Sequence, residues 1–143
     1  MRVLSIAIIF ISLLQSKNEL AIFWGDRQNL EFEDFKGIPP EESSYGAYTN
    51  YSVTEHIRRK NDSVLVTVAC YFNKNDSWIK VKDSLLIQHE TVHFAIAELC
   101  ARKIKNSISK LSLSNNDYLK AIDSTYMLHY ELLLGMQQKY DLE

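Results

Sequence analysis

The chain has 143 residues, of which 46% are hydrophobic and 24% are charged, and its formal net charge is −2. This length fits one domain with a buried core, and the composition excludes a disordered chain. The nearly balanced charge argues against a nucleic-acid partner and against binding to an anionic membrane surface.

The first sixteen residues have the pattern of a secretory signal peptide. Arg2 precedes an apolar run, Val3–Leu14, and polar residues follow it. The run is short for a membrane span, so the sequence predicts a cleaved signal (1–16) and a mature protein (17–143) that is secreted or periplasmic in a bacterium. The residues around position 16 fit a cleavage site only loosely. An uncleaved anchor is therefore the alternative, and it is the one membrane contact that the sequence suggests.

Short strands are predicted in the first half of the mature domain. The segments "LAIFWG" (20–25) and "LEFEDFKGIPP" (30–40) indicate two strands that end at Gly and Pro turn residues. The segments "SSYGAYTNYSVTEHIRR" (43–59) and "DSVLVTVACYFNKNDSW" (62–78) alternate apolar and polar residues around the turn "KND". Together they predict a long antiparallel hairpin.

Two helices are predicted in the second half. The first follows an N-cap at Asp83 or Ser84 and runs to about Lys110, and the second covers about Asn116 to Tyr140. Apolar and aromatic residues of the second helix, with one histidine among them, recur at steps of three and four: Leu119, Ile122, Tyr126, His129, Leu133, Met136 and Tyr140. This stripe predicts an antiparallel helical hairpin. Strands followed by helices predict an α+β fold, in which an antiparallel sheet packs against that hairpin.

The stretch "LLIQHETVHFAIAELCARKI" (85–104) carries the chemistry of the chain. His89 and His93 are four residues apart, so on a helix their rings share one face and can converge on one metal ion. Glu90, about 100° round the helix from His89, can reach a metal-bound water without being a ligand. The spacing therefore predicts a zinc site with Glu90 as general base. The alternative is a structural helix whose two histidines are hydrogen-bonded to neighbours.

Four segments occur in the order seen in the bacterial DUF922 family, whose members are described as predicted secreted zinc-dependent proteases. They are "FWGDRQNLEFEDFKGIPP", "YGAYTNYSV", "SWIKVKDSLLIQHETVHFAIAELCARKI" and "MQQKYDLE". The chain resembles that family over nearly its whole length after the signal, most specifically from His89 to Arg102. The resemblance implies a zincin-like domain in which His89 and His93 bind Zn²⁺ and Glu90 is the catalytic base. It implies a peptide or protein substrate and nothing narrower.

The sequence offers several candidates for a third zinc ligand. The family pattern continues into a Thr and a His-Gly pair, whereas this sequence ends at Glu143, so the domain is expected to lack the C-terminal end of the family. A catalytic zinc usually has three protein ligands, and the candidates here are Glu131, His129, Asp141 and Glu143. The tail motif slightly favours Asp141, which helix geometry places about 6 Å from His89 along the axis. His129 is expected to be a core histidine bonded to a neighbour.

These observations predict a secreted zinc-dependent metallopeptidase that hydrolyses peptide bonds. The alternatives are a catalytically inactive secreted or periplasmic binding module with the same fold and an incomplete metal site, and a purely structural α+β domain. Tyr140 could donate a hydrogen bond to the oxyanion, although a packing role is favoured. Export leaves two possibilities open for Cys70 and Cys100, which are a disulfide and a pair of buried free thiols.

Overall fold

The computed structural model describes residues 20–61, 63–113 and 117–142, so the predicted signal (1–16) and the candidate ligand Glu143 lie outside the described residues. The elements are β1 (Ala21–Phe23), η1 (Phe32–Asp34), β2 (Ala47–Tyr48), β3 (Tyr51–Lys60), β4 (Ser63–Asn73), β5 (Trp78–Ile79), α2 (Ser84–Ile108) and α3 (Tyr118–Asp141). The predicted α+β class, with antiparallel strands before two helices, is confirmed. None of the helices in the described part is long and apolar enough to cross a membrane.

The main sheet has three antiparallel strands in the order β1-β4-β3. Its β3–β4 ladder runs from Tyr51 opposite Phe72 to Lys60 opposite Ser63, which confirms the predicted hairpin. At the tip, Asn61 has a positive φ of 53°. Asparagine tolerates this left-handed conformation better than most residues, so the tight turn is encoded locally.

The predicted single strand over 43–59 is wrong in one respect, because the chain is interrupted at Thr49 and Asn50 and forms two strands. β2 leaves the main sheet and pairs instead with β5 in a small second sheet. Ser77 holds this bend, because its hydroxyl donates to the Asn73 carbonyl at 2.7 Å and accepts from the Asn50 N–H at 2.8 Å. Ser77 is fully buried, so the bend is fixed by polar bonds that water does not reach.

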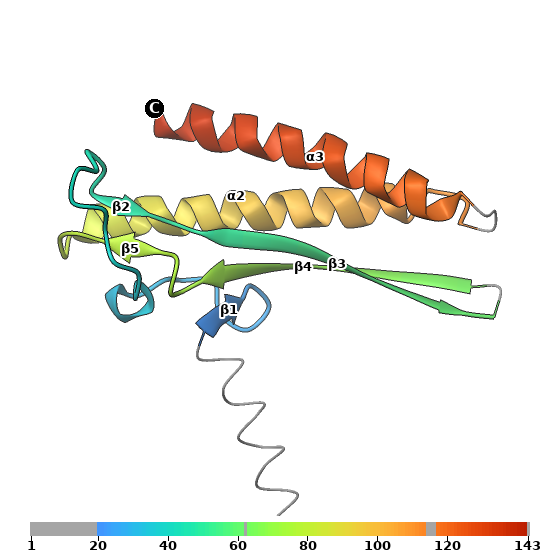
Figure 1. Cartoon of the computed structure of the whole chain (residues 1–143), viewed down its shortest axis with the longest axis horizontal. Helices are drawn as coiled ribbons and strands as arrows, with labels where there is room; N and C mark the ends of the chain where they lie inside the picture. Colours follow the sequence, from blue (N-terminus) through green and yellow to red (C-terminus); the bar gives the residue numbers. More distant parts are fainter. Residues whose placement is uncertain (1–19, 62, 114–116, 143) are drawn as a thin grey trace, which may run out of the picture.

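Helix α2 lies on the main sheet, and α3 lies on α2 as a third layer (Figure 1). The predicted N-cap is confirmed, because the Asp83 carboxylate accepts from the Leu85 N–H at 2.7 Å. Six residues at steps of four and three form one buried stripe of α2: Glu90, Phe94, Ala97, Ala101, Ile104 and Ile108. The stripe packs with Val53, Cys70 and Phe72 of the hairpin into one core.

Helix α3 runs antiparallel to α2, so that its C-terminal end lies beside the first half of α2 (Figure 1). Ile122, Leu133 and Gln137 are its buried residues. The predicted stripe is therefore correct in the middle of the helix and wrong at Leu119, which is 48% exposed. The Tyr126 hydroxyl donates to the Val53 carbonyl at 2.5 Å and so ties α3 to β3.

The strand predicted over 30–40 is wrong, because this segment contains the 3₁₀ turn η1 and no strand. The contacts of Asp34 explain why this segment forms a turn and not a strand. Its carboxylate accepts from the Glu31 N–H at 2.8 Å, from Arg27 at 2.5 Å, and forms an ion pair with Lys74 at 3.2 Å. A buried carboxylate with three such partners outweighs the weak strand pattern of the segment.

Cys70 and Cys100 are both buried free thiols and do not form the disulfide that was the other alternative. The Cys100 Sγ donates to the His129 carbonyl at 3.3 Å. Burial raises the pKa of Cys100 to about 11 and holds the pKa of Cys70 still further above its usual value. Both groups are therefore neutral parts of the core at neutral pH.

Asp34 is expected to make the protein acid-sensitive. Burial would raise its pKa, but the bonds from Arg27, Glu31 and Lys74 prevail and lower the pKa below the ordinary value of 3.8. The stabilisation is therefore complete above pH 3.8 and is lost as the pH falls through the lower folded-state pKa. We expect Asp34→Asn to lower the free energy of unfolding by about 1–3 kcal/mol at pH 7. Between pH 5 and pH 2 the variant should lose less stability than the parent in urea titrations, and equal losses would contradict the assignment.

Candidate metal centre

Three side chains converge on one point at the end of the helical hairpin. The Nε2 atoms of His89 and His93 are 3.0 Å apart. The Asp141 Oδ1 lies 2.8 Å from Nε2 of His93 and 3.4 Å from Nε2 of His89. The two histidines come from one face of α2, and the carboxylate comes from the last residue of α3.

This triangle has the size that a tetrahedral metal site requires. Ligand atoms held about 2.0–2.1 Å from a zinc ion are about 3.3 Å from one another. The three observed separations, 3.0, 2.8 and 3.4 Å, lie close to that value. The cluster could therefore hold a divalent metal ion, although the geometry alone does not identify which.

Gln137 fixes the orientation of the His93 ring. The His93 Nδ1 lies 2.6 Å from the Gln137 Oε1, and the Gln137 amide donates to the His93 carbonyl at 3.0 Å. An amide oxygen can only accept, so the Nδ1 carries the proton and the Nε2 lone pair points to the cluster. Partners of this kind set the tautomer and the direction of metal-binding histidines.

Glu90 lies on the sheet side of α2, next to the cluster. It is only 4% exposed, and its Oε2 has no hydrogen-bond partner among the described residues. The Thr49 hydroxyl donates to the Glu90 carbonyl at 3.3 Å and so joins the bend after β2 to the helix. Burial raises the pKa of Glu90, and this effect outweighs the hydrogen bond of Thr49 and the attraction of His93 and His89.

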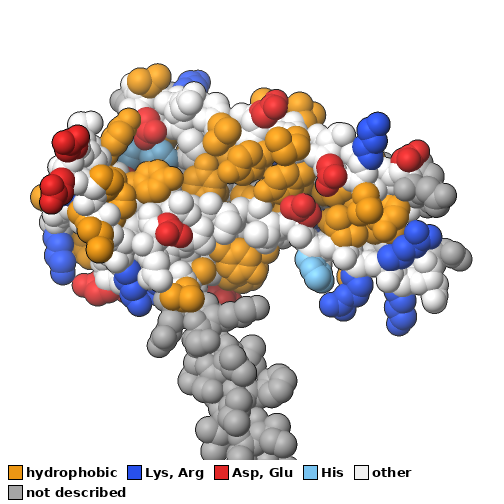
Figure 2. Space-filling model, viewed as in Figure 1, with side chains coloured by type: hydrophobic (Ala, Val, Ile, Leu, Met, Phe, Trp, Pro, Cys, Tyr) orange, Lys and Arg blue, Asp and Glu red, His pale blue; other side chains and the backbone are white. Residues whose placement is uncertain are grey.

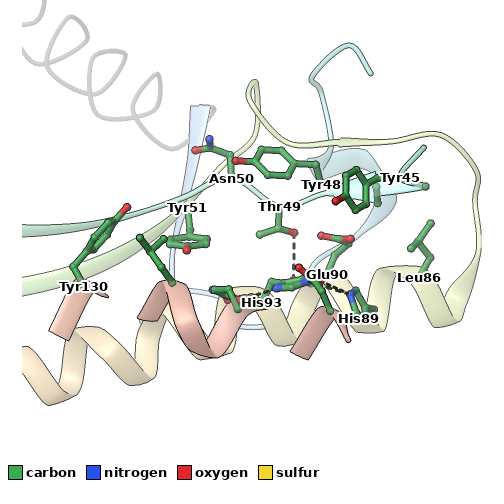
Figure 3. Close-up of a pocket in the computed structure, with 15 residues that line it drawn as sticks. Tyr45, Tyr48, Thr49, Asn50, Tyr51, Leu86, His89, Glu90, His93 and Tyr130 are labelled. Atoms are coloured by element: carbon green, nitrogen blue, oxygen red, sulfur yellow. Dashed lines mark hydrogen bonds and ion pairs between the residues drawn. The ribbon is translucent and has the colours of Figure 1, made fainter. Parts of the chain in front are cut away.

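Glu90 and the three residues of the cluster line one cavity of about 500 Å³ between β2, α2 and α3. Figure 2 shows histidine side chains in the hollow at one end of the molecule, with hydrophobic side chains around it. In Figure 3, His93, Glu90 and His89 lie in the middle of the cavity. The other lining residues are Tyr45, Gly46, Ala47, Tyr48, Thr49, Asn50, Tyr51, Leu86, Tyr130, Leu134 and Gln137.

The remaining predicted residues lie elsewhere or have a packing role. The His129 Nε2 shares a hydrogen bond of 2.8 Å with the Ser107 hydroxyl, as expected for a core histidine. Glu131 is exposed and is not part of the three-residue cluster. The Tyr140 ring stacks on the ring of His89 with 4.6 Å between centroids, a contact that agrees with the packing role favoured from the sequence.

Gln137 was missed in the sequence, although a signal for it was present. With position 113 in the middle of the connection between the helices, positions 133–137 of α3 lie level with the histidine pair. Gln137 is the one polar residue in that range that could point inward, because it lies four residues after the buried Leu133.

Comparison with protein-family models, curated proteins and solved structures finds no match for this chain. The resemblance to DUF922 proteins therefore stays a prediction from the quoted segments. The positions of His89, Glu90, His93 and Asp141 are the basis for any assignment of function.

We expect Gln137→Ala to weaken zinc binding by about 10–100-fold, because the His93 ring loses the acceptor that orients it. Competition with a chromophoric chelator measures this change. Gln138→Ala is the matched control, since Gln138 is the exposed neighbour on the same helix. Thermal unfolding of the metal-free proteins separates lost orientation from lost folding. Equal zinc affinity of the two folded variants would mean that Gln137 does not orient the ring.

Proposed function

We propose that this protein is a zinc-dependent metallopeptidase that hydrolyses peptide bonds. The observation that carries the proposal is the convergence of the His89, His93 and Asp141 ligand atoms beside the buried carboxylate of Glu90 in one cavity. Two imidazoles and one carboxylate are the ligands of a common class of catalytic zinc site. Export through residues 1–16, to the periplasm or the medium, belongs to the same proposal.

The side chains of His89 and Asp141 are 37% and 50% exposed, and all three residues of the cluster line the cavity, so water and substrate can reach it. A zinc ion held there would polarise the scissile carbonyl and lower the pKa of a water molecule beside it. Asp141 supplies one negative charge to balance the cation. The ring of Tyr140, stacked on His89, and the bonds of Gln137 to His93 keep the two imidazoles in place.

Glu90 moves the proton. Its Oε2 is buried and has no partner in the described part of the chain, and a water molecule bound in the cavity would satisfy this acceptor. The carboxylate takes a proton from the attacking water and gives it to the amine that leaves as the peptide bond breaks. The Thr49 hydroxyl binds the main chain of Glu90 and so holds this turn of α2 against the bend after β2.

A peptide is the substrate that suits the walls of the cavity. The run from Tyr45 to Tyr51 lines the cavity without a break. Within this run β2 pairs with β5 along one edge, and no described strand pairs with its other edge. An extended peptide can add to such an edge through main-chain hydrogen bonds, which hold substrates largely independently of their sequence.

The roles of the motif residues can be separated by two substitutions. We expect Glu90→Gln to retain nearly all of the bound zinc and to lose hydrolysis by at least a hundredfold, because the residue transfers protons and is not a ligand. His89→Ala should lose most of the metal. Metal analysis of the purified proteins and cleavage of an unfolded protein substrate measure the two effects. The same zinc loss in both variants would make Glu90 a ligand and would refute its proposed role.

The third ligand has its own test. We expect Asp141→Ala to weaken zinc binding by more than tenfold, whereas Glu131→Ala should leave it unchanged. Both substitutions remove a carboxylate from α3, but only Asp141 reaches the histidines. Loss of a ligand lowers zinc affinity strongly, because the binding energy of the ion also orders the residues around it. Chelator competition on the two variants decides the assignment, and a larger effect for Glu131→Ala would reverse it.

A further inference from the structure

The cavity has two unequal ends on either side of the metal centre. Tyr51 and Tyr130 lie beyond His93 at one end, and Tyr45 and Leu86 lie beyond His89 at the other (Figure 3). Leu134 also lines the cavity, one helical turn after Tyr130 on α3. We name the end formed by Tyr51, Tyr130 and Leu134 the Tyr130 compartment.

The wall of the Tyr130 compartment is held rigidly. The rings of Tyr126 and Tyr130 stack nearly parallel, at 13° and 5.8 Å between centroids. Tyr126 is itself fixed, because its hydroxyl donates to the Val53 carbonyl at 2.5 Å. The Tyr130 ring is therefore supported by a second ring that is bonded to β3. A preformed aromatic wall binds a side chain without the cost of ordering the wall first.

The opposite end is less suited to hold a side chain. A Cβ added at Gly46 would come within 3.2 Å of the Leu86 Cδ2, so strand and helix are already in close contact there. Tyr45 is 70% exposed and no stacking partner for its ring is found in the described residues. The Tyr130 compartment thus has a more rigid wall and more space for a side chain than the end at Tyr45 and Leu86.

The compartment offers no partner to a charged side chain. The cavity lining contains no Lys or Arg, and its two carboxylates are Glu90 and Asp141. Glu90 lies on the far side of His93 from Tyr130 (Figure 3). Burial raises the pKa of Tyr51 to about 12, so its phenol is neutral at physiological pH. A charged side chain placed here would lose its hydration and gain no ion pair.

Resting on the proposed function, we propose that the Tyr130 compartment is the specificity pocket of the enzyme and takes an uncharged aromatic or large aliphatic side chain next to the scissile bond. Rings pack well on a fixed phenol face, and aliphatic chains fill the space beside Leu134. The substrate class is therefore peptides with Phe, Tyr, Leu or a similar residue adjacent to the cleaved bond.

The test measures binding separately from hydrolysis. The zinc-loaded Glu90→Gln protein is titrated with four blocked tripeptides, acetyl-Gly-X-Gly-amide with X as Phe, Leu, Asp or Lys, and followed by NMR. We expect the Phe and Leu peptides to bind roughly tenfold more tightly than the Asp and Lys peptides. Adding Tyr130→Ala should remove this preference, and Tyr130→Phe should retain it. Met127→Ala is the matched control, an exposed apolar residue on the same helix that does not line the cavity.

A charged substitution in the compartment gives a second test of the peptide preference, at a residue that is not part of the buried core. Leu134 is 45% exposed, so Leu134→Glu is expected to fold, to weaken the Phe peptide and to strengthen the Lys peptide. Equal affinity for all four peptides, or a preference that survives both Tyr130→Ala and Leu134→Glu, overturns the specificity pocket. If the preference depends on Tyr130 but the parent protein cleaves none of the peptides, the pocket is supported and the peptidase function is contradicted. Cleavage of all four at equal rates supports the peptidase and overturns the pocket.

Discussion

The contact between Gln137 and His93 is the interaction on which the geometry of the centre depends. The Gln137 side chain binds both the ring and the main chain of His93, so it fixes the position of α3 along α2 as well as the direction of the ring. Asp141 follows Gln137 by one helical turn and therefore reaches the same point. A shift of α3 by one residue would rotate Asp141 by about 100° and remove it from the cluster.

The sheet makes the second contribution, through the bend between β3 and β2. The buried hydroxyl of Ser77 joins the main chain of Asn50, in this bend, to that of Asn73 at the end of β4, and Thr49 then reaches the carbonyl of Glu90. After this interruption β2 pairs with β5, and the segment from Tyr45 to Tyr51 lines the cavity. The polar network thus shapes the cavity as much as the helices do.

The sequence predicted regular elements well where local and tertiary preferences agree. The hairpin of β3 and β4 and the stripe of α2 follow from periodicity, and the start of α2 follows from the Asp83 cap. It failed in the segment from Leu30 to Pro40, because the partners that bury Asp34 include Lys74, forty residues away. It also failed to find β5 as a separate strand, since a two-residue strand has too few positions to show a period.

By itself the sequence determined that His89 and His93 share one face of a helix and that Glu90 lies beside them. Residues four apart always lie on the same face once a helix forms. It slightly favoured Asp141 as the residue that joins them but left Glu131, His129 and Glu143 open, and it gave no role to Gln137. Those choices depend on how far one helix slides along the other. That register is set by the packing of Ile122 and Leu133 and by the Gln137 side chain, which act between segments about forty residues apart. Only the tertiary structure brings these segments together, and with them the Asp141 carboxylate of the cluster and the walls of the cavity.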